Sequence, residues 1–347
     1  MFIKTIKQKI RKFAGPGLQR VAFSSGIMKL FGQIKKANGA IILMYHSVAD
    51  ASQDRWIDKN NHVPADIFAL QMDFLSKNKN VVSLDELIST IQQGKTPESG
   101  TVVITFDDGY LDNMTIAAPI LDKYNFPATL FLPCGYIDRG ENQWIDQVYS
   151  FFKFRSKHIL KWGTNKNVSY DLKNQQEFQI AYNEVCSNLM TSGKESRNHL
   201  LTEIKNQLQP VESIPRLTMN WDDVQTLLSD YTCFNLGGHT IEHTDLTSVT
   251  LDEAEIELRN CAEWIKRETS YTANNFSFCY GRTSEGLRHL ISKSGFNSAC
   301  GGDGIDPIIT NKTQPYRLPR IAAPATMNNF DLLISTYNTG RWRKLNP

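Results

Sequence analysis

Short apolar runs and amphipathic segments alternate along most of this chain. The apolar runs have the length and β-branched content of buried strands, and the segments between them repeat apolar residues at helical spacing. Strands are expected at 40–45, 80–83, 101–106, 128–132, 233–237, 275–279, 296–300 and 317–321, and helices include 64–77, 84–93, 111–124 and 252–268. Parallel strands joined by helices, with polar residues where the strands end, predict an α/β barrel.

The alternation stops over residues 138–220. This stretch is polar and charge-rich, has helical runs at 143–154 and 175–189, and is too long for a single strand–helix unit. We therefore expect an inserted helical subdomain that shapes access to a site. Trp144 and Asp146, at the start of its first helix, are candidates to reach a substrate, although core packing is the simpler role for Trp144.

The first 38 residues differ from the rest of the chain in charge. Residues 1–49 hold nine Lys/Arg and no Asp/Glu, whereas the remainder holds 29 Lys/Arg against 36 Asp/Glu. Apolar residues recur among the basic ones at helical spacing, namely Phe2, Ile3, Ile6, Ile10 and Phe13. Residues 1–38 are expected either to lie on an anionic membrane surface or to pack on the barrel as an ordinary amphipathic helix. The barrel itself is expected to occupy residues 39–347.

Composition narrows the class of protein. A hydrophobic content of 41% in 347 residues can form a sizeable core. Basic and aromatic residues are not interleaved, so we expect no nucleic-acid partner. No apolar run reaches the ~20 residues that span a bilayer, and no apolar stretch precedes a small-residue cleavage site. Six scattered cysteines without a Cys-x-x-Cys pair fit reduced thiols. We therefore expect a cytoplasmic protein, peripheral on the inner membrane face if the basic segment binds lipid.

The strand at 101–106 leads directly into Asp107, Asp108 and Gly109. Two carboxylates at the end of a parallel strand lie where α/β folds build active sites. Neighbouring side chains on a strand point in different directions, so one carboxylate can bind a metal while the other accepts a proton. Asp-Gly is also a common sequence in turns. Taken alone, the segment therefore fits a simple strand-to-turn junction as well as it fits an active site.

Two of the seven histidines, His239 and His243, are four residues apart and directly follow a Gly-Gly pair. On one turn of helix, or in a tight loop of the same pitch, their imidazoles face the same way. Two histidine nitrogens and one carboxylate oxygen are a common facial set for a divalent metal and leave positions open for water and substrate. Two surface histidines on a helix would show the same spacing.

Together, these two motifs resemble those of the polysaccharide deacetylases, the carbohydrate esterase family 4 type, which includes chitooligosaccharide deacetylase-like proteins. Residues 105–109 match the family's first motif and residues 239–243 its second. Further family-like stretches follow the same order at 42–48, 126–131 and 317–321, so the resemblance covers roughly residues 40–325.

The resemblance implies a fold, an activity and a set of site residues. The fold would be a distorted seven-stranded (β/α) barrel. The activity would be metal-dependent removal of acetyl groups from N-acetylated amino sugars, as oligomer, polymer or lipid-linked glycan, in a polysaccharide or glycolipid pathway. Asp107 would be the base that activates water. Asp108, His239 and His243 would hold the divalent metal, expected to be Zn²⁺, with Co²⁺ or Ni²⁺ as alternatives.

The family's third motif is altered in this chain. Ser277 and Cys279 stand where many members carry an Arg and a Pro before the Tyr. The backbone N–H of Tyr280 can still contribute to an oxyanion hole, since that needs no particular side chain. Arg320 is our candidate for the missing charge that orients Asp107 and lowers its pKa.

A general acid is also needed for the departing amine. His46, which ends the apolar run 40–44, is our candidate, against the alternative of a buried structural histidine. The family's later motifs, with their Asp, Trp and late His, are not recognisable here.

Two other functions fit parts of the sequence. The spacing of His239, Glu242 and His243 also matches the inverted zinc-protease motif, with Glu242 as the base. That function requires a regular helix, for which this segment has weak propensity, and leaves Asp107 and Asp108 without a role. A catalytically inactive carbohydrate-binding barrel would explain the altered third motif. It has no physical need for an intact Asp/His/His set, so we expect the deacetylase.

Overall fold

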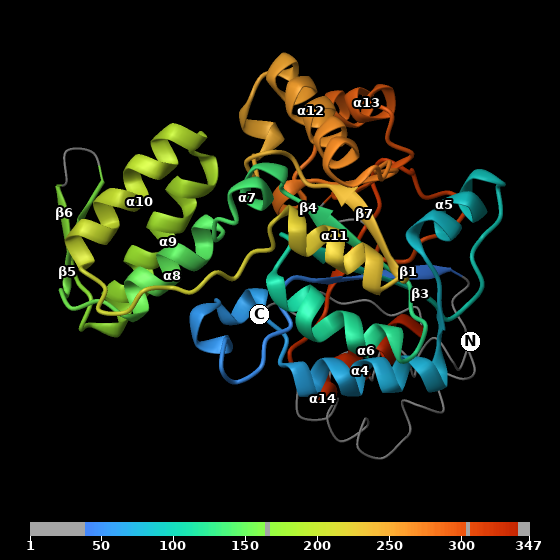
Figure 1. The fold of residues 1–347 in the computed structure, drawn as a ribbon, viewed down its shortest axis with the longest axis horizontal. Coiled ribbons are helices and arrows are strands. Elements are labelled where there is room, and N and C mark those ends of the chain that lie inside the picture. The colour runs from blue at the N-terminus through green and yellow to red at the C-terminus, as the bar shows by residue number, and fades with distance from the viewer. Residues whose placement is uncertain (1–38, 164–166, 303–305, 339–347) are drawn as a thin grey trace, which may run out of the picture.

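A computed structural model describes residues 39–163, 167–302 and 306–338 of the chain. The basic segment 1–38, expected to be an amphipathic helix, lies outside the described residues. Within the described ranges, parallel strands alternate with helices on both sides of an insertion (Figure 1).

Parallel strands form the central sheet. They are β1 (Ala40–Tyr45), β2 (Asn80–Val81), β3 (Thr101–Asp107), β4 (Ala128–Leu132), β7 (Phe234–Gly238), β8 (Asn275–Ser277), β9 (Ser298–Cys300) and β10 (Ile321–Ala322). Their order is β10-β1-β3-β4-β7-β8-β9, and β2 pairs with the start of β3. Every residue of β3 and β4 is buried, as expected for a parallel sheet covered on both faces.

One segment joins the two edges of this sheet. The backbone of Leu318 exchanges hydrogen bonds with Ala299 and Gly301 beside β9. A few residues later, β10 pairs in parallel with Leu43 and Met44 of β1. The sheet is therefore a distorted barrel of seven main strands, which confirms the predicted fold class. The strand expected at 317–321 starts only at Ile321, because Pro319 has no N–H to donate to a ladder.

The helices between the strands cover the barrel. They are α4 (Ala65–Asn78), α5 (Leu84–Gln92), α6 (Ala118–Asp122), α11 (Trp221–Asp230), α12 (Leu251–Thr269), α13 (Glu285–Lys293) and α14 (Met327–Asn338). Figure 1 shows α4, α6, α11 and α14 along one side of the sheet and α12 and α13 along another. Capping boxes led by Ser83, Asn220 and Thr250 begin α5, α11 and α12.

Short helical turns complete the barrel. They are η1 (Asp54–Trp56), η2 (Lys59–Asn61), η3 (Asn113–Ala117), η5 (Leu246–Ser248) and η6 (Cys279–Gly281). The single helix expected at 111–124 is divided, because the π-helical turn η3 ends where α6 begins with Pro119 at its second position.

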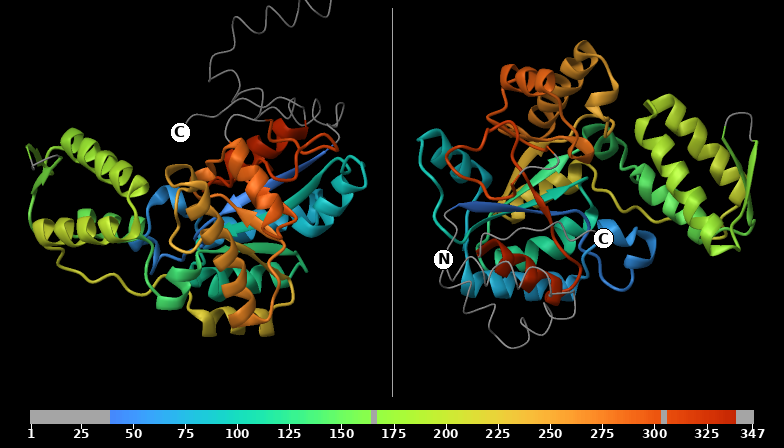
Figure 2. Two further views of the ribbon diagram at one scale, coloured as in Figure 1. Left: turned by 90° about the horizontal axis from the view of Figure 1, so that it is seen from above. Right: turned by 180° about the vertical axis from the view of Figure 1, so that it is seen from behind.

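The insertion between β4 and β7 has its own core. After α7 (Cys134–Arg139) come α8 (Trp144–Lys153), α9 (Gln175–Thr191) and α10 (Lys194–Leu208). Fourteen buried apolar side chains between Trp144 and Leu208 pack together, separate from the barrel core. The three views in Figures 1 and 2 show this subdomain projecting to one side of the barrel.

The insertion also contains a hairpin that the sequence analysis did not predict. Its strands, β5 (Ile159–Trp162) and β6 (Val168–Asp171), pair antiparallel. Each strand has only four residues, too few for alternation to be distinguished from irregular structure.

The six cysteines are free thiols, as expected. None of the helices in the described part of the chain is long and apolar enough to cross a bilayer.

Candidate active site

Strand β3 ends with Asp107 paired to Arg320. Nη1 and Nη2 of Arg320 donate to Oδ1 and Oδ2 of Asp107 at 2.7 and 2.6 Å. Burial acts to raise the pKa of Asp107, but Arg320 outweighs it and the net shift is downward. Asp107 is therefore ionised at neutral pH, and Arg320 lies where the sequence analysis expected an orienting charge.

Asp108 is directed away from Arg320 by its backbone. Its φ is 72°, and the next residue, Gly109, has φ 66°. Two successive left-handed residues turn the chain sharply at the end of the strand. A Cβ on Gly109 would lie 2.6 Å from Cδ1 of Ile137, so only glycine fits there. The turn leaves the Asp108 carboxylate facing the two histidines of the second motif.

The histidines are held in a tight loop, and not on a helix. Strand β7 ends at Gly238, and the loop that follows contains Thr240 at φ 64° and His243 at φ 51°. Oγ1 of Thr240 accepts a hydrogen bond from the Thr244 backbone N–H at 2.9 Å, which closes the loop. The imidazole centroids of His239 and His243 are 4.9 Å apart. Of the two conformations that the spacing allowed, the protein adopts the loop.

Both imidazoles present Nε2 to the same carboxylate oxygen. Oδ1 of Asp108 lies 3.5 Å from Nε2 of His239 and 3.2 Å from Nε2 of His243. Nδ1 of His239 donates to the Ser277 carbonyl oxygen at 2.7 Å, because a carbonyl can only accept. In neutral His239 the proton is therefore on Nδ1, and Nε2 presents a lone pair to the carboxylate.

The surroundings of Oδ1 provide a test of metal binding. This atom is buried and, among the described residues, has no hydrogen-bond partner. A buried carboxylate oxygen that faces two imidazole nitrogens is unfavourable unless a proton or a metal cation lies between them. Two histidine nitrogens and one carboxylate oxygen are donors that suit a divalent transition metal. Asp108, His239 and His243 therefore fit the metal site that the family resemblance implied.

The directions in which their pKa values shift suit metal binding for Asp108 and His243, but not for His239. Burial acts to raise the pKa of Asp108, but the imidazoles outweigh it and hold that pKa well below its usual range. Burial lowers the pKa of His243. Burial would also lower the pKa of His239, but Cys279, Asp107 and Asp108 outweigh it and raise that pKa well above its usual value. A cation at Nε2 of His239 would therefore have to displace a proton.

Cys279 offers a second possible ligand that the sequence analysis did not consider. Its Sγ and the nearest ring nitrogens of His239 and His243 all lie within 4.8 Å of one another. The sulfur, however, lies on the Nδ1 side of His239, 3.9 Å from that nitrogen, which already donates to Ser277. The set that contains Asp108 is therefore favoured.

The seven candidate residues line one cavity of about 400 Å³. They are His46, Asp107, Asp108, His239, His243, Tyr280 and Arg320. The inserted subdomain supplies part of the opposite wall, with Trp144 and Ile145 from α8 and Cys186 and Met190 from α9. Only Trp144 of these four was singled out from the sequence, because the others have no chemical signature of their own.

Two sequence candidates have different surroundings from those expected. Asp146 is fully buried, accepts a hydrogen bond from the Tyr110 hydroxyl at 2.9 Å and is not among the cavity-lining residues, so its expected contact with substrate is wrong. Tyr280 was chosen for its backbone N–H, but its hydroxyl lies 3.0 Å from Nδ1 of His243. No local sequence pattern indicated that contact.

Glu242 lies in an ion-pair cluster outside the cavity. Nη1 and Nη2 of Arg139 donate to its two oxygens at 3.0 and 2.9 Å, and Nζ of Lys194 donates to Oε1 at 2.7 Å. Its carboxylate is therefore occupied, and the loop provides no helix for an inverted protease motif. The regular helix that the protease alternative requires is therefore absent from this loop, all of whose residues the structure describes.

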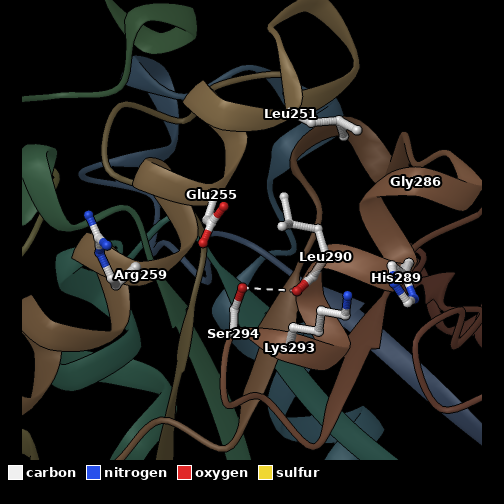
Figure 3. A pocket seen from close by; sticks show the side chains of 8 residues that line it. All are labelled: Leu251, Glu255, Arg259, Gly286, His289, Leu290, Lys293 and Ser294. Carbon is white, nitrogen blue, oxygen red and sulfur yellow. Dashed lines mark hydrogen bonds between the residues drawn. The ribbon is translucent and has the colours of Figure 1, made fainter.

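A second cavity, of about 510 Å³, lies between α12 and α13 (Figure 3). Its eight lining residues are exposed or half-buried, and they include Glu255, Arg259, His289 and Lys293. His289 is exposed on the surface of α13. This cavity has neither the burial nor the converging polar groups of the first.

Comparison with known proteins agrees with this site. The sequence profile of the family described as polysaccharide deacetylase matches residues 94–299. The chain belongs to the polysaccharide deacetylase family. The match contains Asp107, Asp108, His239, His243 and Tyr280, whereas His46 and Arg320 lie outside it.

The chain is also similar to individual proteins. It is 38% identical over 92 residues to YxkH of Bacillus subtilis (strain 168), a protein named after the polysaccharide deacetylases. That alignment covers 26% of this chain and 30% of YxkH.

Two solved structures share the fold over most of their length. The Streptococcus pyogenes deacetylase PplD, in complex with acetate, has a TM-score of 0.56 at 15% identity, over 86% of this chain and 98% of PplD. IcaB from Ammonifex degensii has a TM-score of 0.52 at 14% identity, over 88% of this chain and 98% of IcaB.

Proposed function

We propose that this protein is a metal-dependent hydrolase that removes acetyl groups from N-acetylated amino sugars of a polysaccharide or glycolipid. The observation that carries the proposal is Oδ1 of Asp108, which is buried, has no hydrogen-bond partner among the residues that the structure describes, and is faced by Nε2 of two histidines. An ionised carboxylate, Asp107, lies beside it. Membership of the polysaccharide deacetylase family supports the reaction class and the substrate class.

Asp108, His239 and His243 would hold the cation, with Zn²⁺ as the first candidate and Co²⁺ or Ni²⁺ as alternatives. A divalent cation there polarises the acetyl carbonyl and makes water more acidic. The Ser277 carbonyl keeps His239 in the tautomer that presents Nε2, and the Asp108 turn fixes the carboxylate.

Asp107 would act as the base. It accepts a proton as the oxygen of water attacks the acetyl carbon. Arg320 bonds both of its oxygens, which keeps the carboxylate ionised and fixes its orientation. The backbone N–H of Tyr280 would stabilise the oxyanion of the tetrahedral intermediate.

His46 would act as the acid. It is half-buried and lines the same cavity as Asp107 and the proposed metal ligands. Its imidazolium would give a proton to the amine nitrogen as the C–N bond breaks, so that acetate and a free amino sugar leave.

Acetate release tests the proposal. Purified protein is incubated with N-acetylated oligosaccharides after removal of metal by a chelator, with and without added Zn²⁺ or Co²⁺. Acetate that appears only with the added metal supports the proposal. Binding of the same sugars without acetate release would instead support the inactive carbohydrate-binding barrel, which the intact Asp/His/His set disfavours.

The cellular location is a separate part of the proposal. The basic, amphipathic pattern of residues 1–38 supports peripheral contact with an anionic membrane face and a lipid-linked substrate on the cytoplasmic side. Sedimentation of the full chain with vesicles that contain anionic lipid, and no sedimentation with neutral vesicles, is the expected result.

A further inference from the structure

The hydroxyl of Tyr280 lies between the inserted subdomain and the proposed metal ligands. Its oxygen is 3.0 Å from Nδ1 of His243 and accepts a hydrogen bond from Nε1 of Trp144 at 3.1 Å. The Tyr280 and His243 rings meet edge to face, with centroids 4.8 Å apart. Tyr280 packs against the core of the subdomain and also lines the active-site cavity. One side chain therefore contacts the subdomain, a metal-ligand histidine and the substrate space.

The backbone of Tyr280 has an unusual conformation. Its φ is 58° and its ψ is 12°, in the left-handed region that is unfavourable for a bulky residue. The turn is held by the Gly281 N–H, which donates to the Phe278 carbonyl, and by the Gly302 N–H, which donates to the Gly281 carbonyl. Such strained residues persist where the surrounding structure holds them, and they gather at functional sites. The conformation supports a role for this side chain beyond packing.

The hydrogen bonds that the Tyr280 oxygen accepts determine where its own O–H can donate. The indole N–H of Trp144 can only donate, so it uses one lone pair of the Tyr280 oxygen. When Nε2 of His243 is a metal ligand, the neutral imidazole has its proton on Nδ1, and Nδ1–H donates to the second lone pair. The Tyr280 O–H then has to donate to a third group. Because Tyr280 lines the cavity, a substrate oxygen is in position to accept that bond.

The inserted subdomain also contacts the histidine loop directly. Arg197 of α10 is buried, and its Nη1 donates to the Glu242 carbonyl oxygen at 2.9 Å. Lys194, at the start of the same helix, donates to the Glu242 carboxylate. Glu242 immediately precedes His243, so helices α8 and α10 both fix the surroundings of this ligand.

We propose that Tyr280, held by Trp144 of the inserted subdomain, is a positioning residue for His243 and donates its own proton to an oxygen of the sugar substrate. The subdomain thereby contributes to metal affinity as well as to the wall of the cavity. The identity of the acceptor as a sugar rests on the proposed function. The effect of Tyr280 on metal binding requires only that Asp108, His239 and His243 are the metal ligands, and it can be measured without a substrate.

The substitution Tyr280→Phe keeps the ring and removes the hydroxyl. Loss of a hydrogen-bond partner from a metal-bound histidine weakens metal binding by roughly 10- to 100-fold. We expect that loss in a competition titration of Zn²⁺ against a chromophoric chelator. Tyr170→Phe is the matched control, because the Tyr170 hydroxyl bonds Glu184 within the same subdomain and Tyr170 does not line the cavity. Wild-type zinc affinity in Tyr280→Phe, or an equal loss in both variants, overturns the proposal.

A pair of tryptophan substitutions tests the link to the subdomain. Trp144 and Trp162 both belong to the subdomain core, but Nε1 of Trp162 has no hydrogen-bond partner among the described residues. Trp144→Phe should weaken zinc binding by roughly fivefold, the value of one neutral hydrogen bond. Trp162→Phe should leave zinc affinity unchanged. If Trp144→Phe and Trp162→Phe had equal thermal stability and equal zinc affinity, Trp144 would act through packing alone, and the proposal would be contradicted.

Catalysis gives the second readout. Loss of a donor that bound substrate and transition state use equally raises KM with little change in kcat, so Tyr280→Phe at saturating Zn²⁺ should raise KM. A change in kcat alone would argue against a substrate contact. If wild-type protein released no acetate from any sugar, the proposed function would fail, and the zinc affinity of Tyr280→Phe would still decide the positioning role. If the wild-type protein released acetate and Tyr280→Phe kept wild-type zinc affinity, the positioning role of Tyr280 would be refuted and the proposed function would stand.

Discussion

Asp107 and Asp108 are neighbours in the chain, but their surroundings give them different chemistry. Arg320 bonds both oxygens of Asp107, whereas Oδ1 of Asp108 faces two imidazole nitrogens without a hydrogen bond. The left-handed backbone of Asp108 separates the two carboxylates. At the residue scale, the proposed division between base and metal ligand therefore follows from one backbone angle and one guanidinium group.

The first prediction separates these two roles. Asp107→Asn should keep zinc binding and lower kcat by about 10²- to 10⁴-fold, the range for loss of a general base. His239→Ala should abolish both tight zinc binding and acetate release, because it removes a proposed ligand. Zinc content and acetate release are measured on the same preparations. Full activity of Asp107→Asn would show that the base is another group.

The second prediction concerns pH. Arg320 lowers the pKa of Asp107, so the base of the wild-type protein loses its charge only in strongly acidic solution. Arg320→Gln removes that effect and leaves burial to raise the pKa. At a given acidic pH, less of the base is then ionised, and the acid limb of the kcat/KM profile should move to higher pH. Arg320→Lys keeps the charge and should move the limb less. An unmoved limb would contradict the role given to Arg320.

At the scale of elements, the site depends on how β3, β7 and the loop after β7 fit together. Gly237 of β7 has no room for a side chain, since a Cβ would overlap the Phe131 ring of β4 and lie 2.8 Å from the Asn275 carbonyl oxygen of β8. The glycine therefore allows three neighbouring strands to approach at the point where the chain enters the His239 loop.

The third prediction tests this close approach. Gly237→Ala should destabilise the protein by about 1–3 kcal/mol through overpacking. It should also weaken zinc binding, because the backbone shift moves His239. Gly94→Ala is a comparison with open space around the added Cβ, although its positive φ adds strain of its own. Denaturant unfolding and zinc titration measure both effects, and an unchanged zinc affinity would show that the loop is positioned independently of the strand.

The fourth prediction concerns Glu242 in the same loop. Glu242→Gln removes ion pairs with the half-exposed Arg139 and the exposed Lys194, so it should cost about 1 kcal/mol or less. The Arg197 contact to the backbone carbonyl remains. Acetate release should therefore be largely kept, whereas a protease that used Glu242 as its base would be inactive. Loss of all hydrolytic activity in this variant would revive the protease alternative.

At the scale of the whole molecule, residues far apart in sequence form the site. Asp108 and His239 come from strands β3 and β7, and between these strands in the chain lies the inserted subdomain. A cation bound by both would link the two parts of the barrel. The folded state binds it and the unfolded chain does not, so binding adds to stability.

The fifth prediction follows from this linkage. Zn²⁺ at about 100 times its Kd should stabilise the protein by about 2.7 kcal/mol. The melting temperature of the chelator-treated wild-type protein should therefore rise by several degrees when zinc is added. His239→Ala should show no such rise. An equal rise in the two proteins would indicate that zinc binds elsewhere.

The sequence was sufficient to predict the barrel, because strand and helix periods are properties of neighbouring residues. The resemblance of its motifs to those of the polysaccharide deacetylases selected the seven candidate residues, which line one cavity. Asp107, Asp108, His239 and His243 could be found from such motifs. The structure was needed for the two-bond geometry of the expected Arg320–Asp107 pair, for the choice between helix and loop at His239, and for the Tyr280 hydroxyl between Trp144 and His243. These depend on contacts between residues that are 37 to 213 positions apart, or on backbone angles set by packing. Local sequence patterns record neither, so only the tertiary structure decided them.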